Sequence, residues 1–241
     1  MESAPLPTVA LVTGGIRGLG LATARLLAAQ GQLVHITYHR SDGRAAKLEA
    51  EFPGRIHQAD LEDQPQSEAL VQAILERDGR LDSLVHAVGN YDTGQATGAA
   101  LLTAMWRSNA MTAMHVAAAA RGAIESSQGA MVFFGCAGLE GHGPRLDSAA
   151  YAAAKSALLV LVKSLAVELA LSGARANMIS PGLIPHDAAH EDAMSEELLA
   201  QIPMGRPGSP AEVAAAAAFL TSDQSSYTTG ANLPVSGGWM I

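Results

Sequence analysis

The chain is short of cysteine and of basic residues, and each shortage excludes a class of protein. Cys136 is the one cysteine among 241 residues, so neither an internal disulfide nor a cysteine-based zinc site can form, and a reducing, cytoplasmic location is expected. Fifteen basic and 23 acidic side chains give a net charge of −8, which argues against nucleic acid or an anionic membrane as the partner. Charged residues are only 16% and hydrophobic residues 49%, enough apolar material for one large core.

Long hydrophobic runs and linkers are also missing. No apolar stretch approaches the roughly 18 residues of a membrane span. The first residues lack the basic start and apolar run of a secretory signal, so we expect a soluble protein with no cleaved leader. No stretch rich in proline and serine divides the chain, and residues 1–241 are therefore interpreted as one domain.

Short apolar runs alternate with helix-length patterns along the chain. The helix-length pattern at residues 19–30 lies between the first two runs. The apolar runs are residues 9–12, 33–38, 84–88, 131–134 and 176–179. Strands that are apolar on both faces belong to a parallel sheet covered by helices. The sequence therefore predicts an α/β, doubly wound Rossmann-type fold.

A glycine-rich turn follows the first apolar run. Four glycines in TGGIRGLG, residues 13–20, stand between a predicted strand and a predicted helix. Glycines let backbone N–H groups and the helix N-terminus approach a pyrophosphate, and this is the context that a dinucleotide site requires. The cofactor contacts predicted in this turn are Gly14, Arg17, Gly18, Leu19 and Gly20.

The turn after the second apolar run favours NADP over NAD. A fold that prefers NAD carries an acidic residue about 20 positions beyond the glycines, to hold the ribose 2′-hydroxyl. Here Arg40 offers a planar set of donors for a 2′-phosphate, Ser41 adds a hydroxyl, and Arg17 lies in the glycine turn. Asp42 keeps NAD as the alternative, since its carboxylate could reach a ribose. The predicted contacts in this turn are Tyr38, His39, Arg40 and Ser41.

A tyrosine and a lysine four residues apart begin an apolar helical stretch that runs to residue 171. This spacing places Tyr151 and Lys155 on one face of the helix. Reduction of a carbonyl by hydride requires a proton for the developing alkoxide, and a phenol beside a fixed positive charge becomes a better acid near neutral pH. The sequence therefore indicates Tyr151 as a proton donor whose pKa is lowered by Lys155.

Residues 185–203 are bounded by prolines and are rich in His, Asp and Glu. They predict a mobile segment with a short helix around residues 195–201, and both a lid over a site and a plain surface excursion fit this composition. His142, His186 and His190 lack a regular ligand spacing, so no metal site is expected.

In their order along the chain, these motifs resemble the short-chain dehydrogenase/reductase family over nearly the whole sequence. Asn109 resembles the family's catalytic asparagine, Asp60 with Leu61 its adenine contact, and Pro181 with Gly182 its PG motif. The resemblance implies a seven-stranded parallel sheet. It also implies that Tyr151 is the acid/base, that Asn109 holds a water in a proton relay, and that Lys155 binds the nicotinamide ribose. Further backbone contacts to the cofactor are implied at Ala87, Gly89, Pro181, Gly182 and Ile184.

The C-terminal third, with RPGSPAEV at residues 206–213, is also similar to the family. The whole chain is most similar to 3-oxoacyl-acyl-carrier-protein reductases, and residues 38–41 are similar to the same turn in pteridine reductases; neither similarity fixes a substrate. The resemblance further implies a homo-oligomer, a dimer or tetramer, with an interface on the apolar faces of residues 105–120 and 158–169.

Three motifs depart from the pattern of the family. Leu183 and Ile184 stand where it often has a threonine after its PG motif, which leaves the carboxamide contact to backbone groups or His186. The family's strand-four motif Asn-Asn-Ala-Gly is replaced by HAVG at residues 86–89, which removes two amide side chains. Its catalytic serine after the fifth strand is replaced by Cys136, or by Gly135 if the gap is placed differently. A thiol is a weaker donor than a hydroxyl, so an oxyanion contact is weakened unless Ser148 or a water replaces it. A small buried filler is the other interpretation of Cys136.

The sequence thus predicts an NADP-dependent oxidoreductase that transfers hydride between NADPH and a small or medium carbonyl or alcohol substrate. Its pocket is expected between residues 90–91, residues 139–145 and the segment 185–203. One alternative is reduction of a C=N or C=C bond, as in pterin or enoyl-thioester reduction, which tolerates a missing serine better. The other is an NADP-binding sensor with little catalysis. The predicted catalytic residues are Tyr151, Lys155, Asn109 and Cys136.

Overall fold

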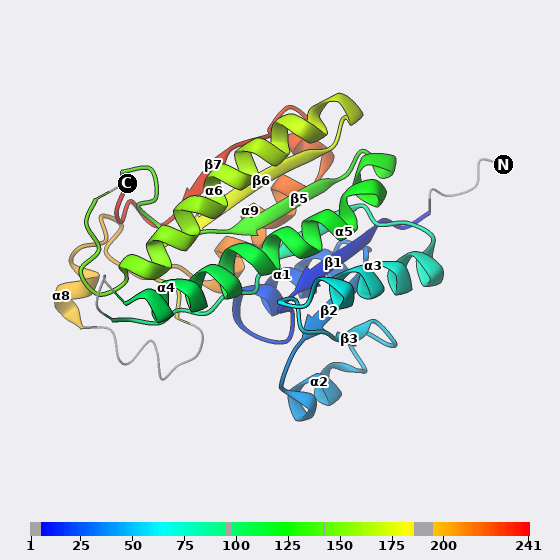
Figure 1. The fold of residues 1–241 in the computed structure, drawn as a ribbon, viewed down its shortest axis with the longest axis horizontal. Helices are drawn as coiled ribbons and strands as arrows, with labels where there is room; N and C mark the ends of the chain where they lie inside the picture. The colour runs from blue at the N-terminus through cyan, green and yellow to red at the C-terminus, as the bar shows by residue number, and fades with distance from the viewer. Residues whose placement is uncertain (1–5, 95–97, 142, 186–194) are drawn as a thin grey trace.

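In a computed structural model, the protein is a parallel sheet with helices on both faces (Figure 1). The structure describes residues 6–94, 98–141, 143–185 and 195–241. In these ranges the sheet has seven strands, all parallel, in the order β3-β2-β1-β4-β5-β6-β7. The strand order reverses between β1 and β4, where doubly wound folds bind their ligands. The predicted Rossmann-type fold with seven parallel strands is confirmed.

Strands and helices alternate along the chain. The strands are β1 (Val9–Thr13), β2 (Leu33–Tyr38), β3 (Ile56–Gln58), β4 (Ser83–His86), β5 (Ala130–Phe134), β6 (Arg175–Pro181) and β7 (Asn232–Val235). The α-helices are α1 (Gly18–Ala29), α2 (Asp42–Leu48), α3 (Gln64–Asp78), α4 (Ala99–Trp106), α5 (Thr112–Ser127), α6 (Ala149–Leu169), α8 (Glu196–Leu199) and α9 (Pro210–Thr221). The segments η1 (Arg107–Met111), η2 (Ala170–Ser172) and η3 (Asp223–Ser225) are a π-helix and two 3₁₀-helices, respectively.

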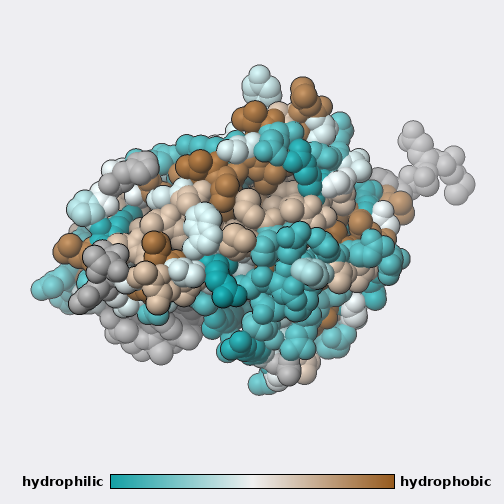
Figure 2. Space-filling model, viewed as in Figure 1, coloured by the Kyte–Doolittle hydropathy of each residue, from teal (hydrophilic) through white to brown (hydrophobic). Residues whose placement is uncertain are grey.

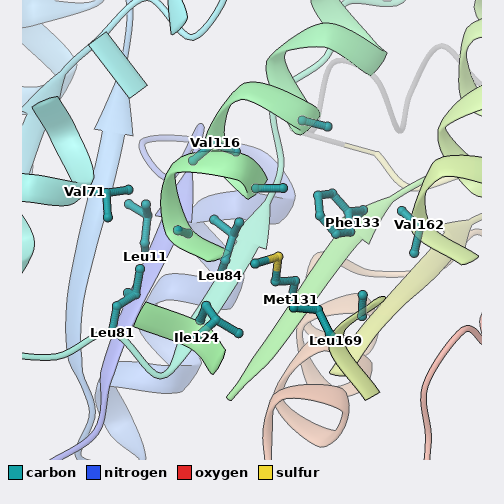
Figure 3. Packing of buried hydrophobic residues seen from close by; sticks show 14 of the residues in the cluster. Leu11, Val71, Leu81, Leu84, Val116, Ile124, Met131, Phe133, Val162 and Leu169 are labelled. Atoms are coloured by element: carbon teal, nitrogen blue, oxygen red, sulfur yellow. The ribbon is translucent and has the colours of Figure 1, made fainter. Parts of the chain in front are cut away.

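The side chains of each strand alternate between two hydrophobic clusters. In β1, Val9 and Leu11 face α3, α5 and α6, whereas Ala10 and Val12 face α1 and α9. Figure 3 shows the first cluster, in which Leu11, Leu84, Met131 and Phe133 of the sheet pack against Val71 of α3, Val116 and Ile124 of α5 and Val162 of α6. Both faces of the sheet are therefore covered, and apolar residues predominate in the central strands β1 and β5, as the sequence predicted.

Two strand ends differ from the predicted runs. β4 ends at His86 rather than at residue 88, because its neighbour β1 ends at Thr13, where the glycine turn begins. β6 extends to Pro181, past the predicted residue 179, because β7 pairs with it as far as that residue. The sheet therefore ends in loops at the carboxyl edge of β1 and β4, which leaves room for a ligand there.

α4, η1 and α5 follow one another without a break, and η1 is a π-helical turn inside this long helix. A π turn changes the direction of the side chains around it and is frequent at functional sites. Asn109 lies in this turn and is fully buried. In the described ranges, no helix is both long and apolar enough to cross a membrane.

Candidate active site

The glycine turn between β1 and α1 is held against β2. The N–H of Gly14 donates to Thr37 Oγ1 and the N–H of Gly15 donates to the Thr37 carbonyl oxygen, both at 3.1 Å. A Cβ at Gly20 would lie 2.5 Å from the Gly14 carbonyl oxygen, so only glycine lets α1 begin this close to the turn. α1 begins at Gly18, and its N-terminal N–H groups point toward the turn. This arrangement fits a pyrophosphate group.

A cavity of about 160 Å³ opens beside the turn, at the carboxyl ends of β1, β2 and β4. Five of the predicted cofactor contacts line it: Gly14, Tyr38, His39, Asp60 and Leu61. The other lining residues are Thr37, Ala59, Glu62, Val88, Asn90, Ser108 and Thr112. Asp60 is held in the wall, since its Oδ1 accepts from the Glu62 N–H at 3.0 Å. The mixed apolar and polar lining fits the adenosine half of a dinucleotide.

The remaining predicted contacts do not line this cavity. Arg17, Arg40 and Ser41 are exposed in the two turns. Leu19 and Ile184 pack in the cluster under α1 and α9. The other residues predicted as backbone contacts lie at or just beyond strand ends. The Ala87 N–H donates to the Thr13 carbonyl oxygen (3.2 Å), and the Gly182 N–H donates to the Val235 carbonyl oxygen (2.9 Å). Pro181 ends β6, and Gly89 lies against Asn109.

Asn109 has a fixed orientation and one atom without a partner. Its Nδ2 group donates to the carbonyl oxygens of Asn90 and Met105, both at 3.0 Å. Its Oδ1 is buried and has no hydrogen-bond partner among the described atoms. A Cβ at Gly89 would touch this Oδ1 and would lie 3.2 Å from Lys155 Nζ. The amide oxygen and the ammonium group therefore lie next to the same point, over a glycine that leaves it open.

Lys155 is buried, and its Nζ donates to the Phe134 carbonyl oxygen at 2.7 Å. The same Nζ lies 5.7 Å from the centre of the Tyr151 ring. Burial lowers the pKa of Lys155 to about 8. α6 thus places both residues on one face, directed at the carboxyl end of β5, as their spacing predicted.

The protonation of Tyr151 differs from the prediction. Burial, together with Cys136 and Tyr91, raises the pKa of Tyr151, and the Arg145 charge opposes this rise. The predicted lowering by Lys155 is wrong for this structure, because removal of the phenol from water outweighs the effect of nearby positive charge. Tyr151 therefore carries its proton, as a donor to a carbonyl oxygen must.

Cys136 follows β5 and is half-buried beside these groups. Burial raises the pKa of its thiol, and the charges of Lys155 and Arg145 act in the opposite direction. The thiol is therefore neutral and is close enough to Tyr151 for the two groups to influence each other. Gly135, the other candidate for the serine's place, lies against Met178 Sδ and Ser180 Oγ. Ser148 immediately precedes α6.

Two residues contact this site in ways that sequence reasoning did not foresee. The ring of Tyr91 meets that of Tyr151 edge to face, with centroids 5.0 Å apart. The Arg145 guanidinium donates to the Ala137 carbonyl oxygen at 2.6 Å and lies 3.1 Å from Met240 Sδ. Both lie in the loops expected to bound a pocket, but the pattern of residue types gave no signal of these contacts.

Nine of the nineteen residues of the predicted lid, 186–194, lie outside the described residues. The helix predicted around residues 195–201 is α8, and its N-cap Ser195 accepts from the Leu198 N–H at 3.2 Å. The histidines His142, His186 and His190 also lie outside the described ranges. Within those ranges, no three His, Cys, Asp or Glu side chains are grouped as metal ligands.

The chain is similar to a family profile and to known reductases over nearly its whole length. A family profile described as Enoyl-(Acyl carrier protein) reductase matches residues 14–240. The chain is 33% identical to the acetoacetyl-CoA reductase of Allochromatium vinosum, over 95% of this chain and 97% of that protein. It is 35% identical to the 3-oxoacyl-[acyl-carrier-protein] reductase of Vibrio cholerae, over 95% and 96% of the two chains.

Solved structures with a similar sequence also share the fold of this chain. A blue fluorescent protein from a metagenomic library, in complex with NADPH, superposes with a TM-score of 0.89 at 32% identity, over 97% of this chain and 98% of that one. A short-chain dehydrogenase/reductase from Serratia marcescens superposes with a TM-score of 0.89 at 29% identity, over 99% and 100% of the two chains.

Proposed function

Because the chain belongs to the short-chain dehydrogenase/reductase family, we propose that it reduces a carbonyl compound to an alcohol with NADPH. Its class as an oxidoreductase follows from the family, and the family uses nicotinamide cofactors. The observation that carries the proposal is the position of Lys155, which lies near the Tyr151 ring and next to Asn109 Oδ1 at Gly89. A proton donor, a cation and an unpartnered acceptor in one neighbourhood are what carbonyl reduction requires.

The residues around the cavity fit a dinucleotide. The turn at Gly14 and Gly20 would hold the pyrophosphate, Asp60 and Leu61 the adenosine, and Lys155 the nicotinamide ribose. The Asn109 Oδ1, which is buried without a partner, calls for a donor, and a water or a ribose hydroxyl would supply one. NADPH, when bound, supplies the hydride.

The chain's own residues supply the proton and hold the reacting group. Tyr151 donates its phenolic proton to the carbonyl oxygen, which becomes the hydroxyl of the product. The positive charge of Arg145, which opposes the rise in the Tyr151 pKa, stabilises the phenolate left behind. Asn109 accepts a hydrogen bond next to Lys155 and so anchors a water through which Tyr151 regains its proton.

Two observations support NADPH rather than NADH. Arg17 and Arg40 are exposed at the two turns beside the cavity wall, so their guanidinium groups are accessible to a 2′-phosphate. The metagenomic blue fluorescent protein, which shares 32% of its sequence with this chain, was solved with NADPH.

The first test is NADPH oxidation, followed by absorbance, with acetoacetyl thioesters, diketones, quinones, dihydropterins and enoyl thioesters, and with NADH in parallel. We expect turnover of ketones with NADPH, and a loss of nearly all turnover in Tyr151→Phe with NADPH binding retained. Turnover confined to pterins or enoyl thioesters would overturn the choice of a carbonyl substrate. Tight NADPH binding with no turnover of any substrate would identify a sensor.

A further inference from the structure

His86 ends β4 at a position where its side chain contacts two hydroxyl groups inside the protein. The residue is buried, with 1% of its surface exposed. Its Nδ1 lies 2.9 Å from Thr13 Oγ1, and its Nε2 lies 3.3 Å from Thr112 Oγ1. Its ring lies beside that of Phe133, with centroids 6.2 Å apart. Both polar atoms of the ring are therefore used.

The direction of these hydrogen bonds follows from the single proton of each hydroxyl. Thr112 Oγ1 lies 2.9 Å from the Ser108 carbonyl oxygen, which can only accept, so the Thr112 proton is committed there. Thr112 Oγ1 must then accept from His86, and the ring proton is on Nε2. Burial, and secondly the charge of Lys155, lowers the pKa of His86 to about 3, so Nδ1 is unprotonated and accepts from Thr13 Oγ1.

The two threonines come from two different elements next to the candidate cofactor cavity. Thr13 is the last residue of β1, and Gly14, which follows it, lines the cavity. Thr112 begins α5 directly after the π-helix η1, and both Thr112 and Ser108 line the same cavity. The intervening Asn109 is the residue whose Oδ1 meets Lys155 at Gly89. The His86 ring is thus a rigid bridge between the glycine turn and the π turn that carries Asn109.

We propose that His86 is a positioning residue for the reaction: as the neutral Nε2–H tautomer it fixes η1 relative to the glycine turn and so sets Asn109 against Lys155. The inference rests on the proposed function, since it assigns Asn109 a part in the reaction. It goes beyond that function by giving a role to a histidine that contacts neither the cavity nor Tyr151. A displacement of about 1 Å in a catalytic group costs on the order of 10²-fold in rate, so such a bridge affects turnover directly.

The tautomer is tested by NMR on the whole protein with ¹⁵N-labelled histidine. We expect one histidine with a protonated Nε2 and an unprotonated Nδ1 whose signals stay constant between about pH 5 and pH 8, where ordinary histidines titrate. The signal is assigned by its loss in His86→Gln. An Nδ1–H tautomer, or titration of His86 in this range, would overturn the proposal.

The positioning role is tested by the kinetics of His86→Leu and His86→Gln. We expect His86→Leu to lower kcat for ketone reduction by about 10- to 100-fold, with a smaller change in the KM for NADPH. His86→Gln, which keeps one donor and one acceptor, is expected to recover most of the loss. The matched control is Asn177→Leu, which also removes a buried side chain with two hydrogen bonds, in this case to backbone groups, but lies in β6. It is expected to lower stability and to keep kcat.

A folded His86→Leu with kcat within twofold of the unchanged protein would refute the positioning role while leaving the reductase function intact. Equal losses of kcat in His86→Leu and Asn177→Leu would also refute it, because a general loss of stability would then explain both. If the unchanged protein reduces no carbonyl compound, the proposed function fails, and the NMR experiment still decides the tautomer. If His86→Leu does not fold, the NMR result and the comparison of His86→Gln with Asn177→Leu decide the proposal.

Discussion

Lys155 combines full burial with a charge that the proposed reaction needs. Burial lowers its pKa to about 8, so the ammonium form, present below that pH, is lost as pH rises through it. We therefore expect NADPH affinity and turnover to fall between about pH 7 and pH 9, as the charge that binds the ribose disappears. A fluorescence titration of NADPH across this range measures the effect. Lys155→Met should bind weakly with no such step, and an unchanged affinity from pH 7 to pH 9 in the native protein would contradict the expectation.

In the proposed reaction, the neutral thiol of Cys136 is a weaker donor to the developing alkoxide than a hydroxyl would be. Loss of one oxyanion donor costs about 10²- to 10³-fold in related chemistry, and a thiol recovers only part of this. We expect Cys136→Ser to raise kcat/KM for ketones by about 10-fold or more. Cys136→Ala is the control of similar size and should give no increase. Equal rates for the serine and alanine variants would show that residue 136 does not face the reacting oxygen.

Single residues differ in how far their roles could be predicted. The spacing of Tyr151 and Lys155 predicts a shared helix face, because α-helical geometry alone decides it. The pKa of Tyr151 could not be predicted, because it depends on burial and on the neighbouring Cys136 and Tyr91, which only the tertiary fold brings to the phenol. The bridge at His86 could not be predicted either. The sequence shows only that a histidine replaces the family's asparagine, whereas the structure shows that its two ring nitrogens contact the hydroxyls of Thr13 and Thr112.

The turn between β2 and α2 carries the proposed choice of cofactor. Arg40 is exposed there, and a charge-assisted bond to a phosphate contributes about 1.5–3 kcal/mol. We expect Arg40→Ala to lower kcat/KM for NADPH by about 10- to 100-fold and to leave that for NADH nearly unchanged. Arg44→Ala in α2, also an exposed arginine, is the matched control and should preserve the preference. An unchanged ratio in Arg40→Ala would show that the 2′-phosphate is held elsewhere.

Helices and strands were predictable where their pattern is local. The apolar runs of β1, β2 and β5 and the helix α1 follow from periodicity and from the glycine turn between them. β3 has only three residues and β7 contains a proline, so neither gives a clear strand pattern, and their pairing with β2 and β6 defines them. The π turn η1 contains no proline or glycine, so the sequence gives no signal from which it could be predicted. Its position depends on the packing of Asn109 against Asn90 and Met105.

A pair of histidines, His35 and His57, links β2 and β3 to α3. We expect this pair to make the stability of the folded protein fall in acid. His35 Nδ1 lies 2.8 Å from His57 Nε2, and His35 Nε2 lies 2.7 Å from Asp78 Oδ2. Burial lowers the pKa of His57 from 6.5 to about 4, and burial also lowers the pKa of His35. The unfolded chain then binds more protons than the folded one below pH 6.5. The contribution of the two histidines to the free energy of unfolding is therefore fully present above pH 6.5. It is lost as pH falls toward 4, at up to about 1.4 kcal/mol per pH unit for each group.

The variant His57→Gln should reduce this acid loss, because one titrating group is removed. The measurement is the free energy of unfolding from urea denaturation at about pH 7.5 and pH 5, without cofactor. His39→Gln, which changes an exposed histidine, is the control and should retain the native slope. Equal slopes in the His57 variant and the native protein would show that the cluster does not control acid stability.

The outer surface suggests how complete molecules associate. Figure 2 shows hydrophobic side chains gathered over the face that α6 presents. Val160 and Val167 of α6 are 64% and 76% exposed, and Leu102 and Trp106 of α4 are also exposed. We expect light scattering at micromolar concentration to give two or four times the chain mass of 24.8 kDa. Val167→Glu should shift the mass downward, whereas Leu6→Glu, at an equally exposed leucine away from α6, should not. A monomeric mass for the native protein would contradict the expectation.

The last residues of the chain touch the loop that follows β5. Met240 Sδ lies 3.1 Å from the Arg145 guanidinium, and the Met240 carbonyl oxygen lies against Gly138. β1 begins at the opposite end of the sheet from this contact (Figure 1). The start of β1 and the segment around Met240 therefore differ in their distance from the proposed reacting groups. An affinity tag or a surface attachment at the amino-terminal end keeps clear of the reacting groups, whereas one joined after Ile241 is anchored beside them.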